Sequence, residues 1–198
     1  MTLVITNGTI IDGRGRDPLV GSLVIEGERI TALGRSDRVT IPRDATVIDA
    51  MGGSILPGLV DCHVHFPLEY PDLLSPLVAA KASGVIEAHK QSFRRAVEAG
   101  VKIAMGTDSG VGKHGENARE LLFMVENGMT PMQAILASTA NAAQLLHVEN
   151  QIGTLEVGKL ADIVVVDGDV LEDISKLADP ANVRLVLKGG QAAKNTLV

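Results

Sequence analysis

The sequence of 198 residues has few aromatic residues, few cysteines and no excess of positive charge. It contains no tryptophan, one tyrosine and three phenylalanines, so a base-stacking surface for nucleic acid is not expected. The formal net charge is −6 and lysine and arginine do not cluster, which also argues against nucleic acid as a partner. The single cysteine cannot form an internal disulfide, which is typical of a reducing compartment.

Long hydrophobic runs are also missing. No stretch reaches the roughly 18 uncharged apolar residues of a membrane span, and the first residues lack the basic segment and apolar run of a signal peptide. The sequence therefore predicts a cytoplasmic protein with no membrane partner. With 45% hydrophobic and 21% charged residues, the chain is long enough for one hydrophobic core or two small ones.

Both ends of the chain are rich in short strands separated by glycine-containing turns. Asn7-Gly8 and the turn at 26–28 each predict a hairpin near the N-terminus, and Lys188-Gly189-Gly190 predicts another near the C-terminus. Four consecutive β-branched residues at 163–166 indicate a strand buried on both faces. We expect an α/β protein whose two ends join in one β-sandwich domain; it comprises residues 1–56 and 153–198.

The middle of the chain shows helical patterns. Residues 85–99, 116–126 and 130–146 have apolar residues at helical spacing, and Gly84 is expected to separate the first helix from a short one before it. Thr130, Pro131 and Gln133 form the pattern of a helix start.

Two histidines follow a turn and an apolar stretch that predicts a buried strand. Because side chains alternate along a strand, Asp61, His63 and His65 would share one face. Two imidazoles about 7 Å apart on one face can bind the same metal ion. A bare His-x-His pattern is also common without function. A second apolar stretch, 101–105, predicts another strand, with Asp108 near its end.

The stretches around these residues carry a resemblance to a known family. Residues 57–66 (PGLVDCHVHF) resemble the first barrel strand of the metal-dependent amidohydrolase superfamily, and residues 99–110 (AGVKIAMGTDSG) resemble its eighth strand. The likeness is greatest to imidazolonepropionase-like and Xaa-Pro-dipeptidase-like members. The resemblance implies that His63, His65 and Asp108 bind one divalent ion, with zinc expected. It also implies that Asp108 is the catalytic base, and that a metal-activated water hydrolyses a C–N bond of an amide, cyclic amide or dipeptide.

The distance between the two motifs is too short for a complete barrel. His65 and Asp108 are only 43 positions apart, whereas six further strands with their helices would need well over about 150 residues. Residues 57–152 therefore resemble a truncated barrel that retains the first and last strands.

Several alternatives remain open from the sequence. His114 follows Asp108 on a loop, where it either contacts a small-molecule substrate or is simply solvated, and His89 is expected to be a solvated helix residue. The chain is either a hydrolase, completed as a homo-oligomer or by a second chain, or a catalytically inactive remnant that serves as an interaction module.

Overall fold

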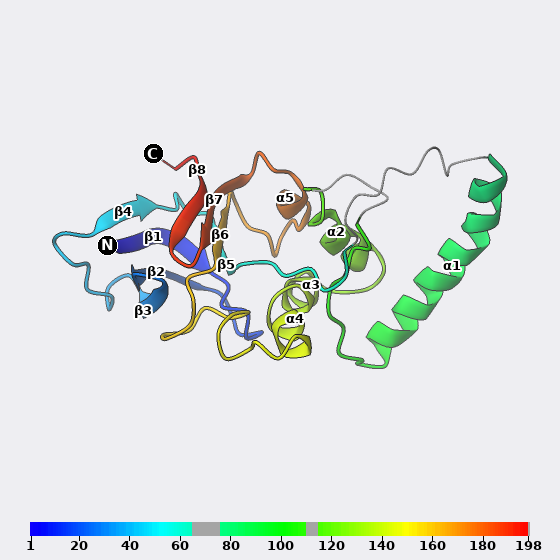
Figure 1. Ribbon diagram of the computed structural model, residues 1–198, viewed down its shortest axis with the longest axis horizontal. Coiled ribbons are helices and arrows are strands. Elements are labelled where there is room, and N and C mark those ends of the chain that lie inside the picture. The colour runs from blue at the N-terminus through cyan, green and yellow to red at the C-terminus, as the bar shows by residue number, and fades with distance from the viewer. Residues whose placement is uncertain (65–75, 110–114, 198) are drawn as a thin grey trace.

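The computed structural model describes residues 1–64, 76–109 and 115–197. A curved β-sheet forms one end of the molecule and contains both chain termini (Figure 1). Helices α2 to α5 lie between this sheet and the long helix α1, which stands apart at the opposite end. In the described part of the chain, no helix has the length and apolar character needed to cross a membrane.

Strands from both ends of the chain pair within one eight-stranded sheet, in the order β3-β2-β1-β5-β6-β7-β8, with β4 also paired to β1. Its strands are β1 (Thr2–Ile10), β2 (Leu19–Glu26), β3 (Arg29–Arg35), β4 (Thr46–Asp49), β5 (Ser54–Pro57), β6 (Ile163–Val166), β7 (Val183–Lys188) and β8 (Gln191–Asn195).

The two ends meet where β5 pairs antiparallel with β6, from Ser54 opposite Val166 to Pro57 opposite Ile163. The α/β class expected from the sequence is confirmed. The strand pairing joins the two ends of the chain in one continuous sheet, as expected from the sequence, and the sandwich arrangement stays a prediction. The division into domains at residues 56 and 153 stays a prediction.

The strand β1 corrects one predicted turn. Asn7 has the left-handed conformation that its place before Gly8 suggested, with φ 54°. It produces an irregularity in the pairing with β2 between Ile5 and Gly8 instead of a hairpin, so β1 continues to Ile10. A Cβ atom on Gly8 would lie 2.4 Å from Cδ1 of Ile55, so a larger residue at this position would displace the Ile55 side chain. The hairpins at 26–28 and 188–190 are present as predicted.

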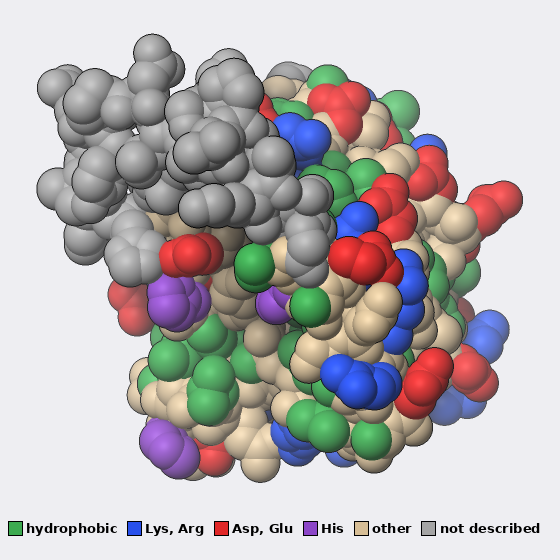
Figure 2. Space-filling view, turned by 90° about the vertical axis from the view of Figure 1, so that its right-hand side faces the viewer, with side chains coloured by type: hydrophobic (Ala, Val, Ile, Leu, Met, Phe, Trp, Pro, Cys, Tyr) green, Lys and Arg blue, Asp and Glu red, His purple; other side chains and the backbone are tan. Residues whose placement is uncertain are grey.

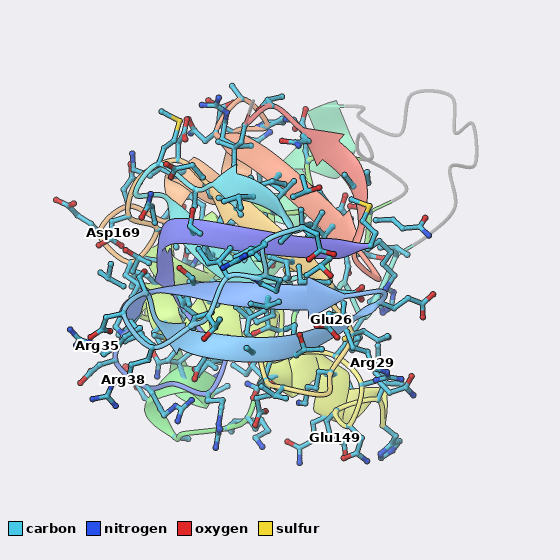
Figure 3. The ribbon with its side chains drawn as sticks, turned by 90° about the vertical axis from the view of Figure 1, so that its left-hand side faces the viewer. Glu26, Arg29, Arg35, Arg38, Glu149 and Asp169 are labelled. Carbon is cyan, nitrogen blue, oxygen red and sulfur yellow. The ribbon has the colours of Figure 1, made fainter. Side chains whose placement is uncertain are left out.

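The sheet separates two hydrophobic cores. Ile163 and Val165 of β6 lie in the core enclosed by the curved sheet, and Val164 and Val166 lie in the core beneath the helices. This alternation confirms the prediction of a strand buried on both faces. Figure 3 shows β1, β2 and β3 side by side, with the labelled side chains of Arg35 and Arg38 at one edge of the molecule and that of Arg29 towards the opposite edge.

The helices differ from the sequence prediction mainly in their boundaries. α1 (Pro76–Glu98) is one continuous helix through Gly84, so the predicted break is wrong: a single glycine lowers helix propensity by only about 1 kcal/mol. The predicted helix 116–126 begins three residues later, as α2 (Arg119–Glu126).

The predicted helix 130–146 is divided in two. α3 (Pro131–Ala137) starts with the expected capping box, in which the Thr130 side chain accepts a hydrogen bond from the amide of Gln133. The hydroxyls of Ser138 and Thr139 both donate to the carbonyl of Ile135, which competes with helical hydrogen bonding and ends α3. The chain then turns into α4 (Ala140–Leu145), and a single turn, α5 (Ser175–Ala178), follows β6.

Candidate active site

Backbone hydrogen bonds fix the segment 58–63, which leads from the end of β5 to His63. After β5, the amide of Gly58 donates to the carbonyl of Asp162 at 2.8 Å, and that of Val60 donates to Ser138 at 2.7 Å. Residues 58–63 form no regular strand, so the prediction of a strand that continues to the histidines is wrong. The segment is nonetheless held at every second residue by the sheet and by the end of α3.

The segments around His63 and Asp108 lie side by side. The amide of Cys62 donates to the carbonyl of Met105 at 2.9 Å, and the amide of Asp108 donates to the carbonyl of His63 at 2.8 Å. Val64 and Ser109 form an isolated parallel bridge. Residues 101–105 form no strand, contrary to the sequence prediction, because a strand requires a continuous ladder and these segments share only a few hydrogen bonds.

His63 and Asp108 present their polar side-chain atoms to one another. The Nε2 atom of His63 lies 3.3 Å from Oδ1 of Asp108, and the two side chains are 63% and 73% exposed. Asp108 has a left-handed backbone, with φ 53°, a conformation that aspartate tolerates better than most residues. His65 and His114 lie outside the described residues.

The carboxylate of Asp61 accepts hydrogen bonds from the segments around His63, Thr107 and Asn117. Its Oδ1 accepts hydrogen bonds from the backbone amides of His63 (3.2 Å) and Thr107 (3.1 Å). Its Oδ2 accepts from the Thr107 hydroxyl (2.6 Å) and from Nδ2 of Asn117 (2.7 Å). Partial burial raises the pKa of the Asp61 carboxyl, but these hydrogen bonds together outweigh it and hold the pKa below its usual value.

Thr107 and Asn117 were not among the site residues predicted from the sequence. Thr107 directly precedes Asp108, and its Oγ1 also lies 2.7 Å from the Ser109 hydroxyl. Asn117 is the second residue before α2, where a polar side chain ordinarily suggests a helix start. Only the tertiary structure shows that both bind the Asp61 carboxylate.

The donors at this site suit a divalent ion. Imidazole nitrogen and carboxylate oxygen are both zinc ligands, at about 2.0–2.2 Å. Two ligands at neighbouring corners of a tetrahedron at that range are about 3.4 Å apart, close to the observed 3.3 Å between His63 and Asp108. No group of three or more potential ligands occurs within residues 1–64, 76–109 and 115–197. Of the three ligands expected from the sequence, His63 and Asp108 are described and His65 is not.

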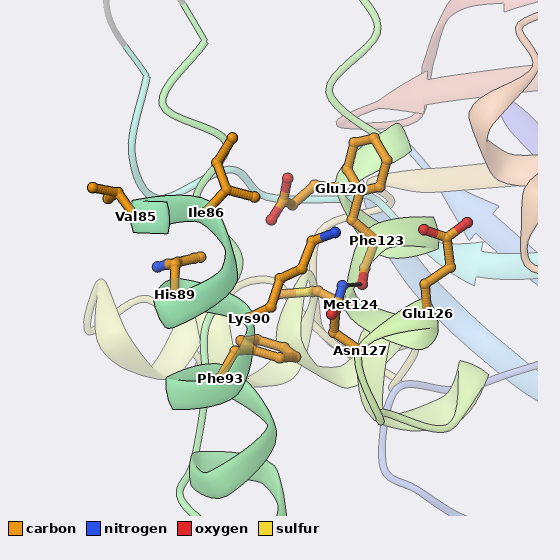
Figure 4. Close-up of a pocket in the computed structure, with 10 residues that line it drawn as sticks. All are labelled: Val85, Ile86, His89, Lys90, Phe93, Glu120, Phe123, Met124, Glu126 and Asn127. Carbon is orange, nitrogen blue, oxygen red and sulfur yellow. Dashed lines mark hydrogen bonds between the residues drawn. The ribbon is translucent and has the colours of Figure 1, made fainter. Parts of the chain in front are cut away.

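A separate groove of about 520 Å³ lies between α1 and α2, as Figure 4 shows. Apolar residues such as Phe93 and Phe123 line it together with Lys90 and Glu120. Burial raises the pKa of the Glu120 carboxyl, the charge of Asp61 raises it further, and His89 acts in the opposite direction. Figure 2 looks onto this end of the molecule and shows exposed hydrophobic side chains among charged ones.

Comparisons with known proteins agree on one family. A sequence model described as "Amidohydrolase family" matches residues 72–193. Ochratoxinase of Aspergillus niger is 40% identical over 117 residues, which is 58% of this chain and 24% of that protein. Imidazolonepropionase of Fusobacterium nucleatum subsp. nucleatum is 30% identical over 150 residues, which is 73% of this chain and 34% of that protein. The chain therefore spans about a quarter to a third of the length of these relatives.

The fold is similar to that of a solved structure. The crystal structure of a Xaa-Pro dipeptidase with bound methionine in the active site superposes with a TM-score of 0.84 and 20% sequence identity. The superposition covers 98% of this chain and 100% of that one. At this identity the likeness bears on the fold alone.

Proposed function

The chain belongs to the amidohydrolase family, and on that premise we propose that it carries the metal-binding and proton-transferring part of a hydrolase that cleaves a carbon–nitrogen bond. Proteins of this family generally use divalent metal ions. The proposed ligands are His63, His65 and Asp108, with zinc as the expected ion. His65 enters this set by its place in the sequence motif.

One observation supports the proposal most directly: Nε2 of His63 lies 3.3 Å from Oδ1 of Asp108, a separation that suits two ligands of one ion. A divalent ion held there would lower the pKa of a bound water molecule towards about 7 and polarise a carbonyl oxygen. His63 has to be neutral to offer Nε2 as a ligand.

Asp108 has the proton-transfer role in this proposal. Its carboxylate accepts a proton from the attacking water and later donates it to the leaving nitrogen, so that the amine departs neutral. The side chain is 73% exposed, which leaves it accessible to a substrate. The proposed substrates are small molecules with an amide, cyclic amide or dipeptide bond. A substrate contact by His114 is also part of the proposal, on sequence position alone.

The exposure of the site suggests that activity depends on association. Catalysis of this kind needs a dry pocket that holds the reacting groups to within about half an ångström. His63 and Asp108 are instead both more than half exposed. We therefore include in the proposal that a second copy of this chain, or a complementing chain, covers the site.

The same exposure favours a second candidate function. In this alternative the chain is a catalytically inactive member of the family that acts as an interaction module. The two candidates differ in whether the purified protein retains metal and whether its turnover depends on Asp108.

The test combines metal analysis with activity across gel-filtration fractions. Zinc retained after gel filtration is measured for the wild type, His63→Ala and His65→Ala, with His89→Ala as the matched control for loss of an exposed histidine. We expect the wild type and His89→Ala to retain zinc and the other two variants to lose it. A wild type that retains no more zinc than His63→Ala would exclude these ligands.

Activity is then measured with N-acyl amino acids and dipeptides, with Asp108→Asn as the blank. We expect Asp108-dependent turnover in the associated fractions. Strong Asp108-dependent turnover in a monomeric fraction would show that association is unnecessary, and no turnover in any fraction that retains zinc would favour the interaction module.

A further inference from the structure

The carboxylate of Asp61 accepts four hydrogen bonds beside the proposed metal site. Both of its oxygens are used: two backbone amides donate to Oδ1, and the Thr107 hydroxyl and the Asn117 amide group donate to Oδ2. The four donors come from three separate segments, around residues 63, 107 and 117. Asp61 therefore joins three segments that belong to no common strand or helix.

The contacts of Asp61 lie directly beside the two described metal-ligand candidates. Its Oδ1 binds the backbone amide of His63 itself. The same atom binds the amide of Thr107, which precedes Asp108. The amide of Asp108 in turn donates to the carbonyl of His63 at 2.8 Å. A carboxylate that binds both backbones holds them at a defined separation, and the segments have few other hydrogen bonds between them.

The second oxygen extends this arrangement to the start of α2. Asn117 donates to Oδ2 of Asp61 through Nδ2, while its own Oδ1 accepts from the amide of Gly115. The hydroxyl of Thr107 donates to the same Oδ2, and it also accepts from the amide of Ser109. Both oxygens of Asp61 are thus directed at backbone amides and at Thr107 and Asn117.

We propose that Asp61 is a positioning residue: its carboxylate does not bind the metal but holds the backbone at His63 and Thr107 so that His63 and Asp108 stay at ligand distance. This inference rests on the proposed function, because it assumes that His63 and Asp108 bind an ion. The competing role for Asp61 is that of a third metal ligand.

An exchange of two side chains separates these roles. In Asp61→Asn, the new amide group faces the amide group of Asn117, so that two donors meet where one donated before. In the double variant Asp61→Asn with Asn117→Asp, the amide at residue 61 donates to the carboxylate at residue 117, the Thr107 hydroxyl turns to accept from the same amide, and the total charge is unchanged. If Asp61 positions the backbone, the exchange restores its function. If Asp61 is a metal ligand, the exchange does not, because residue 61 no longer carries a carboxylate.

Zinc affinity is measured for the wild type, both single variants and the double variant by competition with a chromogenic chelator. Loss of a group that orients metal ligands typically weakens binding by about 10–100-fold. We expect a loss of that size in Asp61→Asn and recovery to within about threefold of the wild type in the double variant. Asp49→Asn is the matched control, since Asp49 also accepts from a backbone amide and an asparagine side chain, far along the sequence from this site.

A second readout uses the metal-free proteins. Hydrogen exchange of the His63, Thr107 and Asp108 amides is followed by NMR, and we expect faster exchange in Asp61→Asn and recovery in the double variant. Wild-type exchange in Asp61→Asn would overturn the proposal. If the wild type binds no zinc, the proposed function is wrong, while this measurement still decides whether Asp61 holds the two segments together.

Thr107→Val provides a test that leaves the Asp61 carboxylate in place. It removes one donor to Oδ2, so a positioning role predicts weaker zinc binding than in the wild type. Unchanged affinity in Thr107→Val, combined with no recovery in the double variant, would overturn the proposal in favour of Asp61 as a ligand.

Discussion

Replacing Gly106 with alanine should displace the segment that carries His63. A Cβ atom on Gly106 would lie 2.8 Å from Cβ of His63 and 3.3 Å from its backbone nitrogen. Carbon atoms in contact are ordinarily about 3.5–4.0 Å apart, so one of the two backbones has to move by about 0.7–1.2 Å. Neither of the obstructing atoms belongs to the far end of a side chain, and a change of rotamer therefore cannot relieve the contact.

The free-energy cost of this displacement can be converted into an expected loss of zinc affinity. Inserting a methyl group into an occupied space typically costs about 1–3 kcal/mol, and the exposed position of Gly106 favours the lower end of this range. The same shift would lengthen the 2.8 Å hydrogen bond from the Asp108 amide to the His63 carbonyl. If the whole cost falls on the bound state, zinc affinity decreases by about 5- to 150-fold.

The assay is zinc titration of the metal-free variant against a chromogenic chelator, together with hydrogen exchange of the Asp108 amide. Gly34→Ala is the matched control. Gly34 lies in β3, and a Cβ atom there would meet Cγ2 of Val39 at an ordinary contact distance of 3.6 Å. Wild-type zinc affinity and wild-type exchange in Gly106→Ala would refute the reasoning, since the contact would then be relieved without moving His63.

Two further predictions concern stability and are measured by urea unfolding. Ser54→Ala should lower the free energy of unfolding by about 1–3 kcal/mol, because the buried hydroxyl donates to one backbone group of loop 168–170 and accepts from another, and an unchanged midpoint would contradict this. Glu120→Gln should stabilise the protein at pH 7, because burial, reinforced by the charge of Asp61, raises the pKa of Glu120 in the folded state and so disfavours its charged form. This gain in stability should disappear as the pH falls below about 4.3, where the carboxyl is protonated in both the folded and the unfolded state. A gain that does not depend on pH would contradict the prediction.

Several features could be predicted from the sequence because they depend on neighbouring residues. The capping box at Thr130 needs only the chemistry of four consecutive residues, and the structure shows it. The run 163–166 needs only its branched apolar side chains to indicate a strand with two buried faces. The left-handed conformation of Asn7 was likewise indicated by its residue type and its glycine neighbour, although its consequence was an irregular strand and not a hairpin.

The candidate site was predictable only in part. The motifs indicated that His63 and Asp108 should lie close together, and the structure places Nε2 and Oδ1 3.3 Å apart. The strand alternation used to place Asp61 and His63 on one face does not apply, because residues 58–63 are irregular. The role of Asn117 depends on a contact across 56 positions of sequence, which no local pattern contains.

The sequence by itself determined the α/β class, the helix start at Thr130, the buried character of β6 and the family to which the site belongs. The family was indicated by the resemblance of residues 57–66 and 99–110 to known motifs, and the other features follow from backbone preferences and side-chain periodicity, which act over a few residues. The sequence also indicated that the two ends of the chain join, but only the tertiary structure decided that they do so through the pairing of β5 with β6, and that Asp61 binds the amides beside both candidate ligands. The physical reason is that hydrogen bonds between distant segments depend on which partners the fold brings within about 3 Å.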